Sequence, residues 1–154
     1  MTTTSTTTSS SSVRTTTGER PVSVRNTAIA TVIGAVGGGV INSLIAWVGR
    51  SALDVPEEFK QLHASTYLPL TVLGAILGAV GWHLIATRKA NATKVLARLV
   101  PIVLVLSTIP DFLLLASDSQ PGTTTAGVIA LIAMHVGAAV AAVPAYRRFI
   151  PPQS

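Results

Sequence analysis

The sequence predicts an all-α membrane protein, with four transmembrane helices in an antiparallel bundle behind a disordered N-terminal tail. Two features of the composition lead to this class, because 49% of the 154 residues are hydrophobic and only 11% are charged. A soluble domain carries about 25% charged residues, so this chain has too few to cover a water-facing surface. The third observation is that the apolar residues gather in four long runs, which a bundle of membrane helices requires.

Residues 1–25 are predicted to form a disordered cytoplasmic tail, because Ser and Thr occupy nearly all of the first 17 positions. A segment of this composition buries too little apolar surface to offset the entropy lost on folding. It does not resemble a secretory signal, since the apolar run that follows begins only at Ala28, is too long and lacks a small-residue cleavage site. Residues 149–154 are expected to form a second, short cytoplasmic tail.

The four apolar runs cover residues 28–48, 68–86, 99–116 and 126–146, within a transmembrane domain of residues 26–148. A helix needs about 20 apolar residues to cross the roughly 30 Å hydrocarbon core, and each run has about that length. Strands of a membrane barrel are shorter, at about 10 residues, and alternate in polarity. Because lipid offers no hydrogen-bond partner to the backbone, each run is expected to be a helix.

The placement of Lys and Arg predicts the orientation. Nine basic residues precede the first run, separate the second from the third, or follow the fourth: Arg14, Arg20, Arg25, Arg88, Lys89, Lys94, Arg98, Arg147 and Arg148. Only Arg50 and Lys60 lie on the opposite side. Since cytoplasmic loops carry the excess of basic residues, both termini are expected in the cytoplasm.

Aromatic side chains occur near the ends of the apolar runs. Such residues favour the boundary between lipid and water, where the ring is apolar and its edge polar. Four residues are therefore expected to anchor the helices at this boundary: Trp47, Tyr67, Trp82 and Tyr146.

The outer connector between the first two runs carries a short helix signal. Asp54 is placed to cap such a helix, and Val55, Phe59 and Leu62 fall on one face of it. The segment is interpreted as a structured connector, or alternatively as a short helix that rests on the membrane surface.

Small residues recur at intervals of four within the runs. In lipid, helices associate through close backbone approach and hydrogen bonds, so such stripes predict tight packing, either within one chain or between two copies. The stripes are Gly34 and Gly38 in the first run, Gly74, Gly78 and Gly81 in the second, and Ala138 and Ala142 in the fourth.

Polar residues inside the runs are the candidate site. An ionisable group at the centre of a membrane helix costs about 2.5–3.5 kcal/mol, so such groups usually face the protein interior or a wet cavity. Asn42, Asp111 and His135 fall in the outer half of the bundle by helical rise, and Ser107 lies one turn before Asp111. The sequence predicts that these four residues form one intramembrane polar cluster.

Two roles for this cluster remain open. It is either a hydrogen-bonded group that fixes helix register, or a small-ligand or proton site entered from the outer side, in which Asp111 and His135 act and Asn42 and Ser107 support them. A histidine beside a carboxylate is suited to proton exchange near neutral pH. The first role corresponds to a structural or accessory membrane module, and the second to a small transporter or proton-linked binder.

Enzymatic and cofactor chemistry are not expected. The absence of cysteine excludes thiol catalysis and cysteine-based metal sites, and one Asp with one His is too small a ligand set for zinc. His83 and His135 differ in depth by about 12 Å, which excludes a haem held by both. The expected partners are the lipid bilayer and a membrane protein or second copy, and no nucleic-acid motif occurs.

Three short motifs resemble a known family. Ser107-x-x-Pro110-Asp111, the Met134-His135 pair and Pro56 with Phe59 are similar to those of small four-span membrane proteins found mainly in actinobacteria, a family of unknown function. The resemblance covers about residues 25–148. It implies a multi-pass protein of the plasma membrane and brings no reaction with it.

Overall fold

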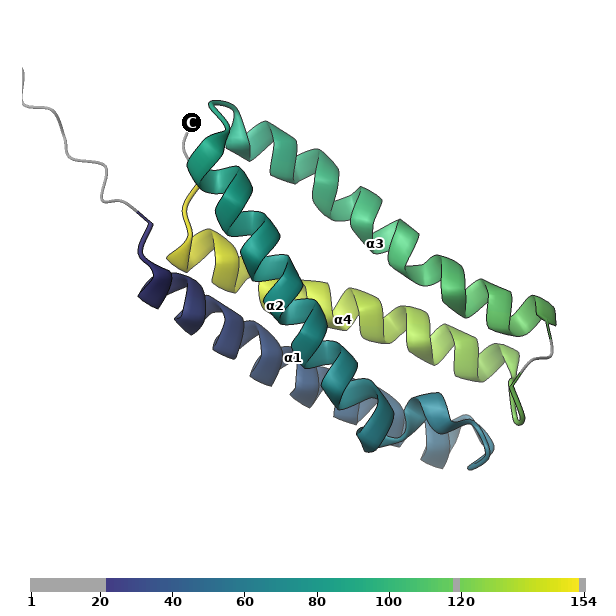
Figure 1. The fold of residues 1–154 in the computed structure, drawn as a ribbon. Helices are drawn as coiled ribbons and strands as arrows, with labels where there is room; N and C mark the ends of the chain where they lie inside the picture. The colour runs from purple at the N-terminus through teal and green to yellow at the C-terminus, as the bar shows by residue number, and fades with distance from the viewer. Residues whose placement is uncertain (1–21, 118–119, 153–154) are drawn as a thin grey trace, which may run out of the picture.

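Four long helices make up most of the described part of the chain, which is residues 22–117 and 120–152 of the computed structural model. The elements are α1 (Val24–Ala52), the single 3-10 turn η1 (Lys60–Leu62), α2 (Ala64–Arg88), α3 (Ala92–Ser117) and α4 (Thr125–Phe149) (Figure 1). The described residues contain no strand, and each of the four helices is long and apolar enough to cross a membrane. The predicted all-α membrane fold is confirmed.

The helices extend beyond the apolar runs. α1 begins at Val24, where the Ser23 side chain accepts a hydrogen bond from the Arg25 amide at 3.2 Å, so the predicted disordered tail is too long at its end. The rest of that prediction concerns residues 1–21, which lie outside the described residues. Hydropathy marks the part of a helix that lies in lipid, whereas backbone hydrogen bonding continues to the next cap. α3 accordingly starts at Ala92, seven residues before its run.

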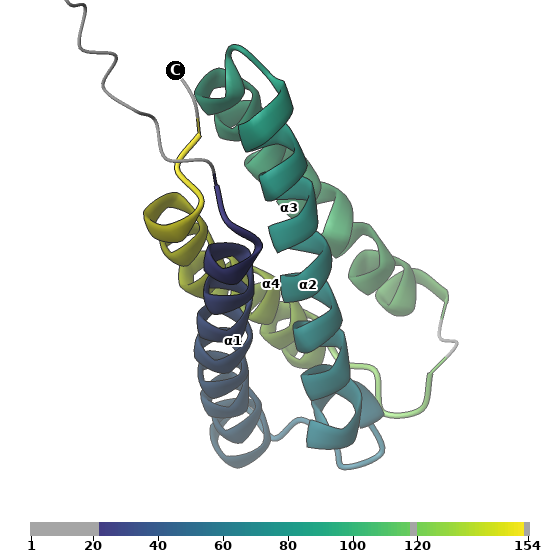
Figure 2. The same ribbon diagram turned by 60° about the vertical axis from the view of Figure 1, so that its left-hand side comes forward.

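The closest helix pair is α1 against α4, which lie side by side in both views (Figures 1 and 2). A methyl group on Gly34 would lie 3.2 Å from the Cβ atom of Ala142 and 3.3 Å from its Cα atom. One turn on, a methyl group on Gly38 would lie 3.5 Å from the Cα atom of Ala138. The small-residue stripes of the first and fourth apolar runs, which lie on α1 and α4, therefore pack against each other within one chain.

The glycine stripe of α2 has a different environment. A methyl group on Gly74 or Gly81 would meet no atom within 4 Å, and only Gly78 faces a neighbour, the Tyr146 side chain. Gly74 and Gly81 therefore do not pack tightly within the chain, and packing of this stripe against a second copy stays a prediction. α3 diverges from α2 along most of its length (Figure 1), and no atom of it lies within 4 Å of a methyl group at either glycine.

The outer connector folds over one end of the bundle. Val55, Phe59 and Leu62 do share a face, but they are buried in an apolar cluster with residues of α1 and α4. Asp54 caps no helix, since it sits in the left-handed backbone region at φ 47°, and only the turn η1 forms. The segment is a structured connector, and the alternative of a surface helix is wrong because its apolar face points into the protein.

Aromatic residues hold the opposite end together. The Trp82 indole N–H donates to the Ile150 carbonyl at 2.9 Å, and its ring packs against Tyr146 with centroids 5.7 Å apart. These two side chains and Tyr67 are buried, so the expectation that they anchor the helices in the lipid interface is wrong. Their polar atoms find partners inside the protein. Only Trp47, at 63% exposure, has the accessibility expected of an anchor.

The antiparallel order brings the basic residues to one end. The start of α1, the end of α2, the start of α3 and the end of α4 lie together there (Figure 1). We call this the basic end, and its described cations are Arg25, Arg88, Lys89, Lys94, Arg98, Arg147 and Arg148. Arg50 and Lys60 belong to the opposite end.

Candidate functional site

A cavity of about 640 Å³ lies beside the open glycine face of α2. Side chains of α2, α3 and α4 form most of its lining, and α1 contributes a small part of the wall. We call it the central cavity. All four polar residues predicted from the sequence border it: Asn42, Ser107, Asp111 and His135.

Asp111 and His135 meet across the interface of α3 and α4. The Asp111 Oδ2 atom lies 3.3 Å from the His135 Nδ1 atom. The same Nδ1 atom is 2.9 Å from the Leu131 carbonyl, and a carbonyl oxygen only accepts, so Nδ1 carries a hydrogen and donates it there. Asp111 is buried on the face of α3 that also buries Thr108. The opposite face of α3 carries exposed apolar residues, so the helix turns the acid inward.

Asn42 joins α1 to α2. Its Nδ2 atom donates to the Thr71 hydroxyl at 2.9 Å, and that hydroxyl donates to the Tyr67 carbonyl at 2.8 Å. The burial of Asn42 follows from its helix face, which also carries the packed glycines of α1. Thr71 was not among the predicted site residues. Its signal was present, because it is the only hydroxyl residue in the run 68–86.

Ser107 does not support the Asp–His pair. Its hydroxyl donates to the Leu104 carbonyl of its own helix at 2.7 Å, and the Thr108 hydroxyl donates to the Val105 carbonyl at 2.8 Å. Pro110 leaves the carbonyl of Leu106 without its usual donor, and either of these hydroxyls or a water molecule could satisfy it. They bond carbonyls two residues and one residue before it, so neither hydroxyl satisfies the Leu106 carbonyl.

Three residues that border the cavity each have one buried side-chain oxygen that accepts no hydrogen bond from a described residue: Asn42 Oδ1, Gln61 Oε1 and Asp111 Oδ2. They come from α1, from η1 and from α3. The Asp111 oxygen has its contact with His135 at 3.3 Å instead. A buried acceptor without a donor costs about 1–3 kcal/mol, so three in one cavity are unusual for a closed core. Gln61 was missed because it lies in a connector, outside every apolar run.

The central cavity opens sideways, between α2 and α3. Leu70 and Leu77 of α2 and Val103 of α3 all border it, and they are 63%, 62% and 53% exposed. The outer end of the bundle is covered by the cluster around Phe59, and the basic end by the cluster around Trp82. The opening of the cavity is therefore at the side of the bundle.

A family of unknown function (DUF6069) matches residues 22–151, a segment that contains all four helices. The chain belongs to this family. No curated protein and no solved structure matches it significantly. The resemblance noted in the sequence is thereby confirmed at the level of a family of unknown function.

The DUF6069 chain offers little that would hold a metal. Within residues 22–117 and 120–152, no three His, Cys, Asp or Glu side chains gather in one place. The other two histidines are outside the central cavity. His63 Nε2 donates to the Glu57 carbonyl at 2.9 Å, and His83 Nδ1 lies 2.8 Å from the Thr27 hydroxyl, where it links α1 to α2. What the cavity offers chemically is a few polar side chains, among them Asn42, Asp111 and His135, in a mostly apolar wall.

Proposed function

We propose that this DUF6069 protein is a non-enzymatic membrane protein that binds a small amphipathic molecule in the central cavity and serves as an accessory module of the membrane. The observation that carries the proposal is that three residues bordering one cavity, Asn42, Gln61 and Asp111, each have a buried side-chain oxygen without a hydrogen-bond donor. A purely structural cluster would pair these atoms, since each unpaired one lowers stability.

The lining defines the chemistry of the ligand. Because the unpaired atoms are all acceptors, the ligand carries hydrogen-bond donors, as an amine, amide or hydroxyl does. The remaining wall is mostly aliphatic, with open space over Gly74 and Gly81, which suits an apolar body. The exposed residues along α2 and α3 make the bilayer the source from which it enters.

Two fluorescent probes test the proposal, namely 1-aminoanthracene, which has an apolar ring system and an amine donor, and anthracene, which lacks the amine. Trp82 borders the cavity, so energy transfer from Trp82 to the bound probe, in a Trp47→Phe background, reports binding in nanodiscs. The amine is expected to bind roughly 5-fold more tightly than anthracene, which is the effect of one net hydrogen bond of about 1 kcal/mol.

Substitutions in the wall locate the binding. Gly74→Leu is expected to fill the cavity and abolish the Trp82 signal, because a side chain there enters open space. Val72→Leu is the matched control, since Val72 is exposed on α2 and does not border the cavity. Equal binding of the two probes, or full binding to Gly74→Leu, would contradict the proposal.

A proton-linked transporter is the second candidate, and the 3.3 Å contact between Asp111 and His135 is the observation that favours it. Uptake of 1-aminoanthracene into proteoliposomes under a pH gradient distinguishes the two. Gradient-dependent uptake that Asp111→Asn and His135→Ala both abolish identifies a transporter, and binding without uptake identifies a binding module. If neither occurs and both variants unfold at lower temperature, the polar cluster serves only to fix the helices.

The proposal includes a plasma-membrane location with both termini in the cytoplasm. Its support is the basic end, with seven described cations against two at the opposite end and the positive-inside rule. Because the sequence has no cysteine, variants with one introduced cysteine test this orientation without labelling at any other position. In intact cells an impermeant maleimide should label Ser51→Cys and leave Ala90→Cys unlabelled, and the reverse result would invert the topology.

An actinobacterial origin and a protein partner complete the proposal. Eight arginines against three lysines, with heavy use of alanine, suit a genome rich in G and C. A second copy or another membrane protein, rather than nucleic acid, is the expected partner in addition to lipid. Support comes from the exposed apolar side chains along α3, such as Val105, Phe112 and Leu113. Mild-detergent purification from native membrane, followed by mass determination, tests for such an assembly.

A further inference from the structure

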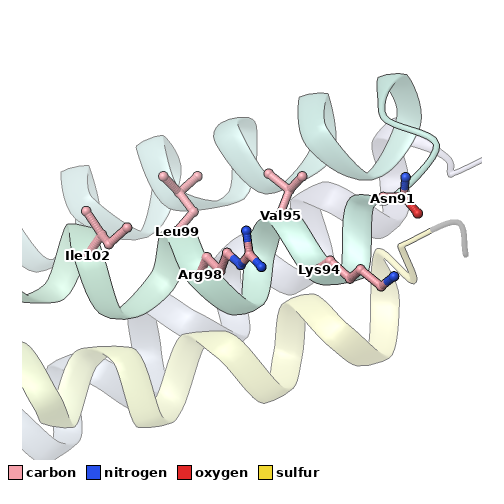
Figure 3. Close-up of a pocket in the computed structure, with 6 residues that line it drawn as sticks. All are labelled: Asn91, Lys94, Val95, Arg98, Leu99 and Ile102. Carbon is pink, nitrogen blue, oxygen red and sulfur yellow. The ribbon is translucent and has the colours of Figure 1, made fainter.

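A second, shallower recess lies on the outer surface of α3 at the basic end. It has a volume of about 430 Å³, and its lining consists of Asn91, Lys94, Val95, Arg98, Leu99 and Ile102 (Figure 3). These residues follow one another along the first turns of α3 and the residue just before it. We call this recess the α3 groove.

The charged side of the α3 groove is unpaired. Lys94 and Arg98 lie one turn apart on the same side of α3, with the Lys94 ammonium nearer Asn91 and the Arg98 guanidinium nearer Val95 (Figure 3). Neither side chain makes an ion pair with a described residue. Among the described residues, the only ion pair joins Asp111 to His135. The described acidic residues all lie in the other half of the bundle: Asp54, Glu57, Glu58 and Asp111. The groove therefore attracts an anion.

The other side of the groove is apolar. Val95, Leu99 and Ile102 form a row at spacings of four and three along the helix (Figure 3), and all three are exposed. From Lys94 to Ile102 the helix rises about 12 Å, which leads from the charged end of α3 towards the middle of the membrane. A dissolved phosphate would contact the two cations and leave this row uncovered. A phospholipid covers both parts.

We propose that the α3 groove binds one anionic phospholipid, with its phosphate between Lys94 and Arg98 and an acyl chain along Val95, Leu99 and Ile102. Arg and Lys donate charge-assisted hydrogen bonds to phosphate oxygens, and basic recesses at the cytoplasmic level of membrane helices suit lipid head groups. Leu99 also borders the central cavity, so the bound lipid lies next to the lateral opening. The site does not depend on the function proposed for that cavity.

Native mass spectrometry of the full chain in detergent tests the site. The bound probes are phosphatidylglycerol and phosphatidylcholine with identical acyl chains. Wild-type protein is expected to retain one phosphatidylglycerol preferentially. The double variant Lys94→Gln/Arg98→Gln should bind it roughly 30-fold more weakly, as expected for the loss of two basic side chains near an anionic head group.

The matched control is Arg147→Gln/Arg148→Gln, which removes the same charge from the basic end but outside the groove. It should bind phosphatidylglycerol as the wild type does, and thermal unfolding should show that both double variants are folded. Equal loss in the control would overturn the site in favour of general attraction to this end. Equal retention of phosphatidylcholine by the wild type, or full competition by glycerophosphoglycerol without acyl chains, would overturn the assignment to an anionic lipid.

Discussion

Two Gly→Ala substitutions separate the packed helix face from the open one. At Gly137 of α4 the new Cβ atom would lie 2.5 Å from the Ile41 Cγ2 atom of α1. Ile41 is β-branched and has essentially one favoured rotamer in a helix, so the helices must move apart. Overpacking costs about 1–3 kcal/mol, and the better helix propensity of alanine offsets up to about 1 kcal/mol of it.

At Gly74 of α2 the same methyl group meets no atom within 4 Å. Gly74→Ala should therefore leave the protein unchanged or stabilise it by about 0.5–1 kcal/mol. Gly137→Ala should destabilise it by up to about 2 kcal/mol. The gain in helix propensity applies to both variants, so they should differ by the overpacking cost of about 1–3 kcal/mol.

The assay is unfolding by SDS titration in mixed micelles, followed by the fluorescence of Trp82 in a Trp47→Phe background. Trp82 is a suitable reporter because it is buried against Tyr146. If Gly74→Ala destabilises the protein as much as Gly137→Ala does, α2 is packed along its glycine face and the central cavity is closed. That result would refute the reasoning about both glycines and about the cavity.

Three further substitutions test other contacts with the same titration. Phe59→Ala should destabilise by about 3–5 kcal/mol, because it empties a fully buried position under the outer connector; a loss below 1 kcal/mol would mean that the connector is not seated. A double-mutant cycle of Asn42→Leu and Thr71→Val should give a coupling of about 0.6 kcal/mol and at most about 1.7 kcal/mol, and strict additivity would deny their 2.9 Å hydrogen bond. Tyr146→Phe removes a 2.6 Å bond to the Ala75 carbonyl and should cost about 1 kcal/mol, whereas an unchanged midpoint would show that the hydroxyl is solvated.

The four helices could be predicted from the sequence because an apolar run of this length in lipid must satisfy its backbone hydrogen bonds internally, as a helix does. The sequence was not sufficient to predict their arrangement. The glycine stripes of α1 and α2 have the same spacing, yet Gly34 touches Ala142 while Gly74 faces open space. The spacing of small residues indicates how closely a helix could approach a neighbour, but it does not indicate whether a neighbouring helix lies there. For α2, the presence of a neighbour depends on the path of α3. That helix makes few contacts with the bundle, since only four of its described residues are buried.

The candidate site was partly predictable for a similar reason. Asp111 and His135 stand out because ionisable groups are costly in lipid, and the structure brings them within 3.3 Å of each other. Gln61 has no such signal, since a glutamine in a connector is ordinary until the connector folds over the bundle. Trp82 and Tyr146 were misjudged because the polar atom that suits an aromatic residue to the lipid interface can equally bond a buried carbonyl.

The seam between α1 and α4 also constrains the order in which the protein is assembled. It joins the first and the last of the four helices, so its two halves are separated by the whole of α2, η1 and α3. During synthesis, Gly34 and Gly38 enter the bilayer long before Ala138 and Ala142 exist. The contact between α1 and α4 thus cannot form until the last of these helices has been made, and until then the small-residue face of α1 has no α4 against it.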